Sequence, residues 1–166
     1  MKNKFLTLAL CFLSLPAFAL YQIGDKVSDI SWTDVNNDTI HLSDHGNQIR
    51  VLLFNAGWCG PCNSEMDELV PQVSEFNQKQ VTFISLSAEG WERGDSPDQT
   101  FLRSWKKKHH IPFFVAASPD DFGSDFSDQS YIPLVAIIDS HGKLAYSAVS
   151  PGADAIVQEV RSLLSK

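Results

Sequence analysis

The chain has 166 residues, of which 43% are hydrophobic and 20% are charged, proportions that are ordinary for a globular protein. This length is typical of a single domain, and the sequence contains no internal repeat or low-complexity stretch. The 20 acidic residues outnumber the 13 basic ones, which gives a formal net charge of −7. Because nucleic-acid binding depends on neutralising phosphates with Lys and Arg, we expect no nucleic-acid partner.

The first 19 residues read as a secretory signal peptide. Lys2 and Lys4 give the first residues a positive charge, residues 5–15 are apolar, and residues 17–19 read Ala-Phe-Ala, a typical cleavage site. The apolar segment is short for a membrane span, and the small-residue site favours removal over retention as a membrane anchor. We therefore expect cleavage after Ala19, export to the periplasm, and a mature domain of residues 20–166 that does not span the membrane.

Removal of this segment changes both the cysteine count and the charge. Cys11 lies within it, and Leu10 is too large for the position that precedes a lipidated cysteine. The mature chain keeps two cysteines, Cys59 and Cys62, and has 11 basic against 20 acidic residues, a formal net charge of −9. Since the periplasm is an oxidising compartment, a reductase working there would need a supply of electrons.

The mature chain begins with an extended lead-in, residues 20–29, followed by a predicted β-hairpin. Residues 30–35 and 39–42 flank a turn cluster of Asn and Asp at 36–38. Residues 50–54 are then almost continuously apolar, which is typical of a central strand covered on both faces.

Two cysteines follow this strand at the start of a predicted helix. Cys59 and Cys62 are three positions apart, so they lie one turn apart on one helix face and can close and reopen a disulfide. Cys59 would occupy the helix N-terminus, where free N–H groups and the helix dipole favour the thiolate that attacks disulfides. We therefore predict Cys59 as the nucleophile and Cys62 as the more buried resolving thiol. The helix is expected to reach Asn77, with Pro71 kinking it or ending its first half.

The alternatives to redox chemistry are a static disulfide or half of a zinc site. A structural zinc site has four ligands, usually with a second Cys or His pair at short spacing. The nearest histidines, His45 and His109, flank no such pattern. We therefore expect no bound metal and no cofactor.

A strand–helix–strand unit comes next in the chain. Residues 81–86 read as a second buried strand, and Ser96 and Pro97 suit the cap and the first position of a helix. The basic run at 106–110 suits the end of that helix, where the dipole favours positive charge. With a third strand at 113–117, these elements predict a parallel βαβ crossover.

The last third of the chain predicts a hairpin and a helix. An acidic, polar segment at 118–130 precedes the apolar strand 134–138, and residues 143–149 form the returning strand. A final helix with one apolar face begins at Gly152 or Asp154. One hypothesis is that the acidic segment rims the active site and selects basic partners.

The motif Trp58-Cys59-Gly60-Pro61-Cys62 after a hydrophobic strand resembles the active site of thioredoxins. The surrounding chain is similar to the exported TlpA/ResA-like thiol–disulfide oxidoreductases, over about residues 23–165 and most strongly at 51–65 and 131–149. The resemblance implies a single α/β domain with a thioredoxin-like fold. Its expected parts are a central mixed sheet with helices on both faces, an N-terminal β-hairpin and a βαβ insertion.

The resemblance also implies roles outside the cysteine pair. Pro133 stands where a central strand would exclude proline. By the resemblance, it corresponds to a cis-proline that leaves the Ile132 backbone free to pair with a substrate. The alternative is an ordinary trans proline at the start of a strand. The family usually has threonine where this chain has Leu134. Glu65 corresponds to an active-site acid, although the helix dipole alone would favour a first-turn glutamate. Trp58 is expected to pack beside the cysteines and restrict access to them, with a core role as the alternative.

The Gly-Pro pair between the cysteines resembles reducing thioredoxins, near about −270 mV, rather than strong oxidants near about −120 mV. We therefore expect a periplasmic reductase of protein disulfides, with cytochrome c apoproteins or other envelope proteins as clients. A membrane thiol–disulfide electron donor of the DsbD type would regenerate it. The alternatives are a periplasmic oxidase or isomerase, or a carrier that holds Cu(I) between the two thiolates.

Overall fold

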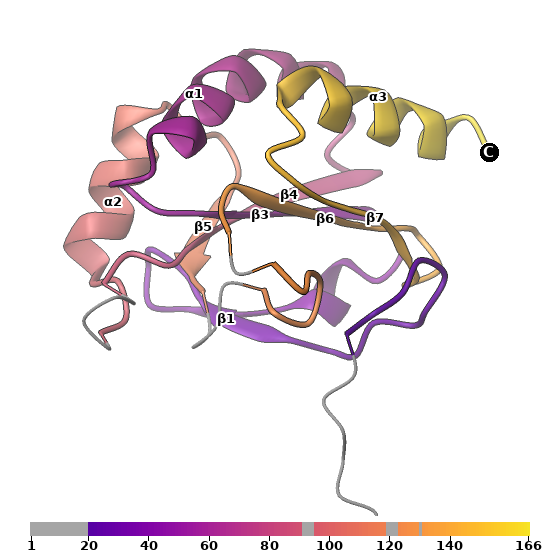
Figure 1. Ribbon diagram of the computed structural model, residues 1–166, viewed down its shortest axis with the longest axis horizontal. Helices are drawn as coiled ribbons and strands as arrows, with labels where there is room; N and C mark the ends of the chain where they lie inside the picture. The colour runs from indigo at the N-terminus through magenta and orange to yellow at the C-terminus, as the bar shows by residue number, and fades with distance from the viewer. Residues whose placement is uncertain (1–19, 91–94, 119–122, 130) are drawn as a thin grey trace, which may run out of the picture.

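The computed structural model describes residues 20–90, 95–118, 123–129 and 131–166. The predicted signal peptide, residues 1–19, lies outside the described residues. The elements run in the order β1 (Ser31–Thr33), β2 (Thr39–His41), the 3-10 helix η1 (Leu42–His45), β3 (Ile49–Asn55), α1 (Gly60–Leu69), the 3-10 helix η2 (Val70–Glu75), β4 (Val81–Ser87), α2 (Gln99–Lys108), β5 (Phe114–Ala117), β6 (Leu134–Ile138), β7 (Leu144–Val149) and α3 (Ala153–Leu164). Figure 1 shows this arrangement.

The main sheet is mixed, as predicted, and has the strand order β5-β4-β3-β6-β7. Strands β3, β4 and β5 are parallel, whereas β6 is antiparallel to both β3 and β7. All seven residues of β3 are buried, which confirms its central place. Strands β1 and β2 pair separately as the predicted N-terminal hairpin, and β4, α2 and β5 form the predicted βαβ insertion.

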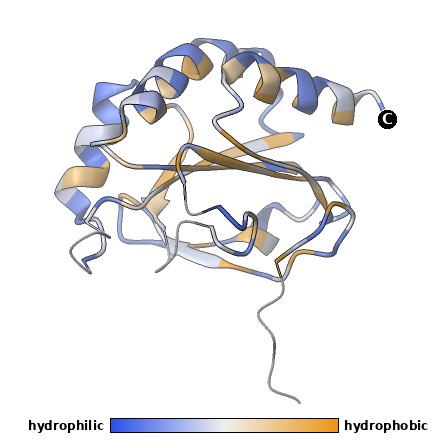
Figure 2. Ribbon diagram, viewed as in Figure 1, coloured by the Kyte–Doolittle hydropathy of each residue, from blue (hydrophilic) through white to orange (hydrophobic). Residues whose placement is uncertain are grey.

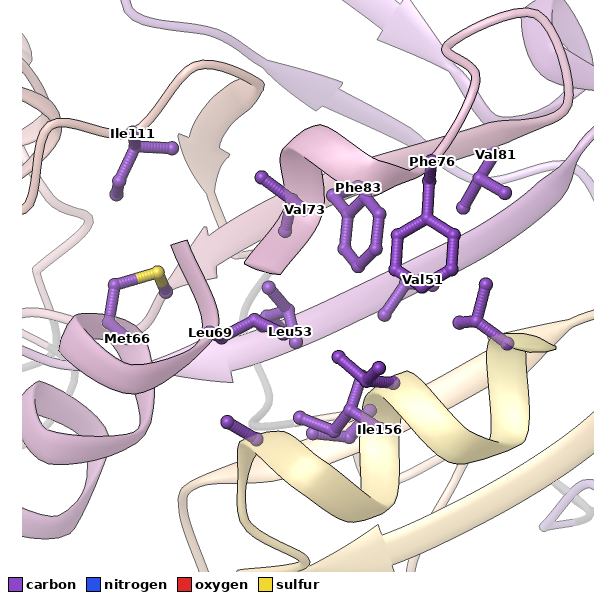
Figure 3. Close-up of a cluster of buried hydrophobic side chains, with 14 of the residues drawn as sticks. Val51, Leu53, Met66, Leu69, Val73, Phe76, Val81, Phe83, Ile111 and Ile156 are labelled. Atoms are coloured by element: carbon purple, nitrogen blue, oxygen red, sulfur yellow. The ribbon is translucent and has the colours of Figure 1, made fainter. Parts of the chain in front are cut away.

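One face of the sheet packs against the helices. Because successive side chains of a strand point to opposite faces, Val51 and Leu53 of β3 belong to the cluster on this side. Figure 3 shows Met66 and Leu69 of α1 and Ile156 of α3 gathered around them. The hydrophobic stripes of the helices face the sheet, and their hydrophilic sides face outward (Figure 2).

The second face of the sheet differs from the expectation, which was that helices cover both faces. Leu52 and Phe54 of β3 cluster here with Trp32 of the hairpin, Leu42 of η1 and Phe126. All three α-helices contribute instead to the cluster on the first face. The reason is that the crossovers from β3 to β4 and from β4 to β5 run in the same direction, so right-handed connections place α1 and α2 on one side.

The acidic segment contributes to this second layer in its described part. Phe126 is buried, and its ring lies 5.5 Å from that of Tyr21 and 5.9 Å from that of Phe54, between centroids. Residues 119–122 and 130 lie outside the described residues. The hypothesis that the segment selects basic partners therefore stays a prediction.

Two helix boundaries differ from the sequence prediction. Helix α2 begins two residues later than expected, because Asp98 rather than Ser96 is its cap: the Asp98 carboxylate accepts a hydrogen bond of 2.7 Å from the Phe101 N–H. The active-site helix ends at Leu69, and the chain continues as a 3-10 helix. Pro71 lies in this 3-10 segment, as expected for a residue that cannot donate the next α-helical hydrogen bond.

The segment before β3, which comprises the lead-in and the hairpin, also reaches both edge strands of the main sheet. On one side, Lys26 forms a bridge with Lys143, and the Leu144 N–H at the start of β7 donates to the Asp25 carbonyl at 2.9 Å. On the other side, Asp34 forms a bridge with Ala116 of β5. The segment before β3 therefore covers one face and touches both edges of the sheet.

Candidate active site

The two cysteines form a disulfide at the N-terminal end of α1. Their Sγ atoms are 2.00 Å apart. Cys59 is the N-cap residue, and Cys62 lies in the first turn with Pro61. Cys62 is 1% exposed and Cys59 5%, which agrees with the predicted order of burial. The Cys62 N–H points to the Cys59 Sγ at 3.2 Å. On reduction, this N–H and the helix dipole would stabilise a thiolate at Cys59 and so favour it as the nucleophile.

The turn that leads from β3 to Cys59 is held by the neighbouring loop. The Gly57 N–H donates to the Glu89 carboxylate at 2.9 Å, which places the loop after β4 at the active-site end. A Cβ atom at Gly57 would lie 2.8 Å from the Phe101 ring, so a larger residue here would have to displace that ring. Trp91, which belongs to the same loop, lies outside the described residues.

A second segment, 73 residues further along the chain, meets the disulfide. The Ile132–Pro133 peptide bond is cis, as predicted, and the Ile132 carbonyl oxygen lies 3.7 Å from the Cys59 Sγ. The Ile132 side chain also packs against the small buried cluster formed by Ala56 and the two cysteines. The strand order brings these segments together, because β6 follows Pro133 and pairs directly with β3.

Two aromatic side chains next to these segments are exposed. Trp58, which precedes Cys59, is 55% exposed, and Tyr131, which precedes Ile132, is 68% exposed. Such exposure excludes the core role considered for Trp58. Large exposed aromatic side chains beside a reactive group are typical of a binding surface. The sequence prediction did not single out Tyr131.

Glu65 is buried one turn beyond Cys62. It is 8% exposed, and its Oε2 accepts a hydrogen bond of 3.2 Å from the Gly152 N–H at the start of α3. Burial raises the pKa of Glu65 to about 7; the Gly152 hydrogen bond lowers it and the charge of Glu68 raises it further. Because α1 begins at Gly60, Glu65 lies in the second turn, so attraction to the helix N-terminus does not account for its position.

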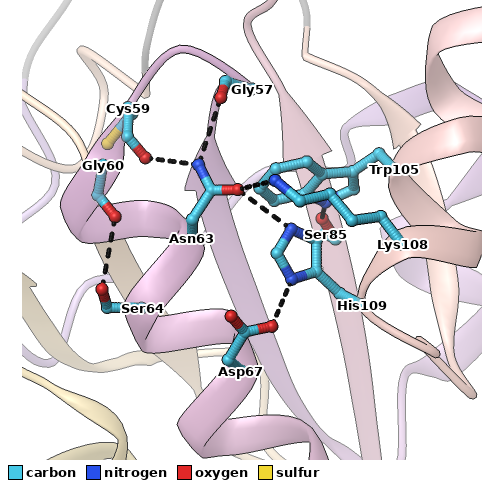
Figure 4. A network of polar contacts seen from close by, with 10 residues as sticks. All are labelled: Gly57, Cys59, Gly60, Asn63, Ser64, Asp67, Ser85, Trp105, Lys108 and His109. Atoms are coloured by element: carbon cyan, nitrogen blue, oxygen red, sulfur yellow. Dashed lines mark hydrogen bonds and ion pairs between the residues drawn. The ribbon is translucent and has the colours of Figure 1, made fainter.

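A polar network that the sequence prediction missed joins α1 to the end of α2 (Figure 4). The Asn63 amide nitrogen donates to the Gly57 carbonyl at 3.1 Å and to the Cys59 carbonyl at 2.8 Å. The Asn63 oxygen lies within hydrogen-bonding distance of Lys108 and of His109. The nucleophile's backbone is therefore connected to the basic end of α2 through a single side chain.

The described residues hold no cluster of three or more His, Cys, Asp or Glu arranged to bind a metal ion. In the same part of the chain, no helix combines the length and the hydropathy needed to cross a membrane.

Known proteins share the fold and parts of the sequence. The chain is similar to the thiol–disulfide oxidoreductase ResA of Oceanobacillus iheyensis (31% identity over 77 residues, covering 44% of this chain and 40% of that protein). It also resembles the ResA protein of Bacillus cereus (25% identity, covering 74% of this chain and 67% of that protein). The crystal structure of a Chlorobium tepidum protein described as a putative thiol:disulfide interchange protein DsbE superposes with a TM-score of 0.71 (21% identity, covering 87% of this chain and 99% of that one).

The O. iheyensis match spans less than half of that relative's length, whereas the superposition covers 87% of this chain and establishes the fold. The model of the AhpC/TSA family matches residues 23–147. This match includes β1 to β6, both cysteines and the cis-proline segment. The chain therefore belongs to the AhpC/TSA family.

Proposed function

We propose that this protein is a thiol–disulfide oxidoreductase whose reactive group is the Cys59–Cys62 pair. One observation carries the proposal: the disulfide lies at the N-terminus of α1 and against the cis Ile132–Pro133 segment. This arrangement supplies a thiolate-stabilising helix end and a backbone to which a substrate strand can pair. Membership of the AhpC/TSA family and the similarity to ResA proteins support the same chemistry.

In the reductive direction, the Cys59 thiolate attacks one sulfur of a target disulfide. The second target sulfur leaves as a thiolate and takes a proton, while Cys59 and the target form a mixed disulfide. The Cys62 thiolate then attacks the Cys59 Sγ, and the remaining target sulfur is released. Two electrons pass to the target, and the pair ends as the disulfide seen in the structure.

Glu65 would serve as the proton acceptor for this second step. Cys62 must lose its proton before it attacks, and it is almost fully buried. Glu65 follows it by three residues on the same side of α1, and its pKa of about 7 suits proton transfer near neutral pH. Burial raises the pKa of Tyr146 most, followed by the charge of Glu159 and then by the charge of Glu65, so Tyr146 lies near Glu65.

Substrate binding would use the surface around Cys59. An extended target segment would pair with the Ile132 backbone beside Pro133, and the exposed ring of Trp58, the residue before Cys59, would contact the same target. The exposure of Trp58 supports this role, because a free indole ring supplies a large apolar contact area at little cost in conformational entropy. Leu134, in place of the usual threonine, is fully buried in the cluster with Leu52 and Phe54, so it would not contact a substrate directly.

The physiological direction that we propose is reduction of envelope proteins in the periplasm, with regeneration by a membrane thiol–disulfide donor of the DsbD type. The Gly60-Pro61 spacer supports a low reduction potential by analogy with reducing thioredoxins. Cytochrome c apoproteins are one class of client.

The reduction potential of the mature protein, residues 20–166, tests this direction. Equilibration with dithiothreitol should give a value near about −270 mV. A value well above the glutathione poise, with an acidic Cys59, would make the protein an oxidase or isomerase instead. In addition, a Cys62→Ser variant exposed to periplasmic extract should retain mixed disulfides at Cys59, and Cys59→Ser should retain none. Capture of equal amounts by the two variants would contradict the assignment of the nucleophile.

A further inference from the structure

Asn63 holds the turn that presents the nucleophile. Its Nδ2 donates to two main-chain carbonyls, at 3.1 Å to Gly57 and at 2.8 Å to Cys59. Only the amide nitrogen can make these bonds, because an oxygen in the same place would face two other acceptors. The orientation of the Asn63 side chain is therefore determined, and its Oδ1 must point toward α2, as Figure 4 shows.

His109 lies next to the oxygen atom of the Asn63 amide. Its side chain is fully buried, with Nδ1 2.6 Å from the Asp67 carboxylate and Nε2 3.2 Å from the Asn63 oxygen. Both ring nitrogens face acceptors, and the two contacts are satisfied together only when the ring carries both protons. The Trp105 ring packs against the imidazole, with centroids 4.2 Å apart, so the ring is fixed in place.

The charged groups around His109 are of both signs. Asp67 on α1 faces the ring directly, and Lys108 on α2 donates to the same Asn63 oxygen. In the described part of the chain, these are the charged side chains that hydrogen-bond to the ring or share its acceptor. The Asp67 carboxylate compensates the charge of the His109 ring that it contacts, and the positive charge of Lys108 is left beside the N-terminal end of α1. Positive charge at this position favours a thiolate.

We propose that Asn63 and His109 are positioning residues for thiol–disulfide exchange. His109 orients Asn63 through its Nε2, and Asn63 holds the Gly57–Cys59 turn so that the first N–H groups of α1 point at the Cys59 sulfur. This inference rests on the redox activity of the Cys59–Cys62 pair and not on the direction or clients proposed above. A merely structural role, in which Asn63 fastens α1 to α2, would change stability without changing the properties of the thiol.

The test compares Asn63→Ala and His109→Gln with a neighbouring control, His110→Asn. His110 is exposed and has a φ of 52°, a conformation that Asn tolerates. Two properties are measured in the folded, mature protein. The first is the pH dependence of Cys59 alkylation, which reports its thiol pKa. The second is the equilibrium constant for reduction of the disulfide by glutathione, which needs neither a client nor a donor.

For Asn63→Ala, we expect the midpoint of Cys59 alkylation to rise by about one pH unit. The equilibrium constant for reduction of the disulfide should fall about tenfold, which corresponds to a reduction potential lower by about 30 mV for a two-electron couple. His109→Gln should shift both in the same direction by a smaller amount, because glutamine keeps a donor near the Nε2 position but carries no charge. His110→Asn should match the wild type. The proposal is overturned if both test variants match His110→Asn within twofold.

A measurement on the wild type keeps the proposal testable if Asn63→Ala does not fold. The ¹⁵N chemical shifts of the His109 ring should show a proton on Nε2, the nitrogen that faces the Asn63 oxygen. An unprotonated Nε2 would contradict the orienting role of His109. A high reduction potential of the wild-type pair would refute the proposed direction but would leave the comparison among the variants intact.

Discussion

The clearest quantitative prediction concerns Glu65, a carboxyl group buried between α1 and the start of α3. Its pKa rises from 4.5 to about 7 in the folded protein because burial disfavours the charged form. Between these two values the folded state binds more protons than the unfolded state, so the free energy of unfolding must fall as the pH rises through this range. Since one pKa unit corresponds to about 1.4 kcal/mol, the loss attributable to Glu65 is at most about 3 kcal/mol.

Replacement by glutamine isolates this contribution. Glu65→Gln has nearly the same shape, keeps an oxygen that can accept from the Gly152 N–H, and does not titrate. We expect the wild type to lose about 2–3 kcal/mol more than Glu65→Gln between pH 4.5 and pH 8. The variant should therefore be relatively more stable at the higher pH.

The assay is urea unfolding of the oxidised protein at several pH values, because cysteines in a disulfide do not titrate. The histidines contribute equally to the wild type and the variant, so the difference between the two curves reports Glu65. Glu68→Gln, an exposed neighbour on the same helix, is the control and should keep most of the wild-type slope. Parallel curves for the wild type and Glu65→Gln would refute the reasoning.

Three further predictions concern stability, and each is measured by urea or thermal unfolding. Ile156→Ala truncates a fully buried side chain of α3 and should cost about 2–5 kcal/mol; a loss below 1 kcal/mol would mean that the core closes around the cavity. Asp98→Ala removes the cap of α2 and should cost about 1 kcal/mol, whereas Asp98→Asn should retain most of this stability. Gly123→Ala places a methyl group 2.9 Å from the Phe54 ring at a φ of 75°, and should destabilise the protein more than Gly24→Ala, where φ is 97° and the space is open; equal losses would point to backbone strain alone.

Local patterns in the sequence predicted most of the secondary structure and the centre of the site. The apolar run before the cysteines, the Cys-Gly-Pro-Cys spacing and Pro71 each act over a few residues, so their consequences can be derived from propensity and periodicity. The strand that includes Val51 and Leu53 and the disulfide at the helix end agree with this prediction, and the cis bond before Pro133 agrees with what the family resemblance implied.

The features that were missed depend on which distant segments meet. Helices on both faces were expected from the resemblance, yet the side on which α2 lies follows from the direction of two successive crossovers, which only the strand order reveals. The contact between Asn63 and His109 joins positions 46 residues apart. A partial signal was present: Leu102, Trp105 and His109 have the spacing of one helix face, and that face is buried. The prediction instead grouped His109 with the basic run at the helix end.

The segment before β3 has a consequence for solubility. An unpaired edge strand is a template on which a second chain can add its own strand, and this domain has two such edges, β5 and β7. Residues 24–35 hydrogen-bond to both, through Leu144 on one side and Val115 on the other. If a proteolytic cut released residues 24–35 from both edges, two sites of strand addition would be uncovered at once, and we expect the nicked protein to self-associate in solution even with the Cys59–Cys62 disulfide intact.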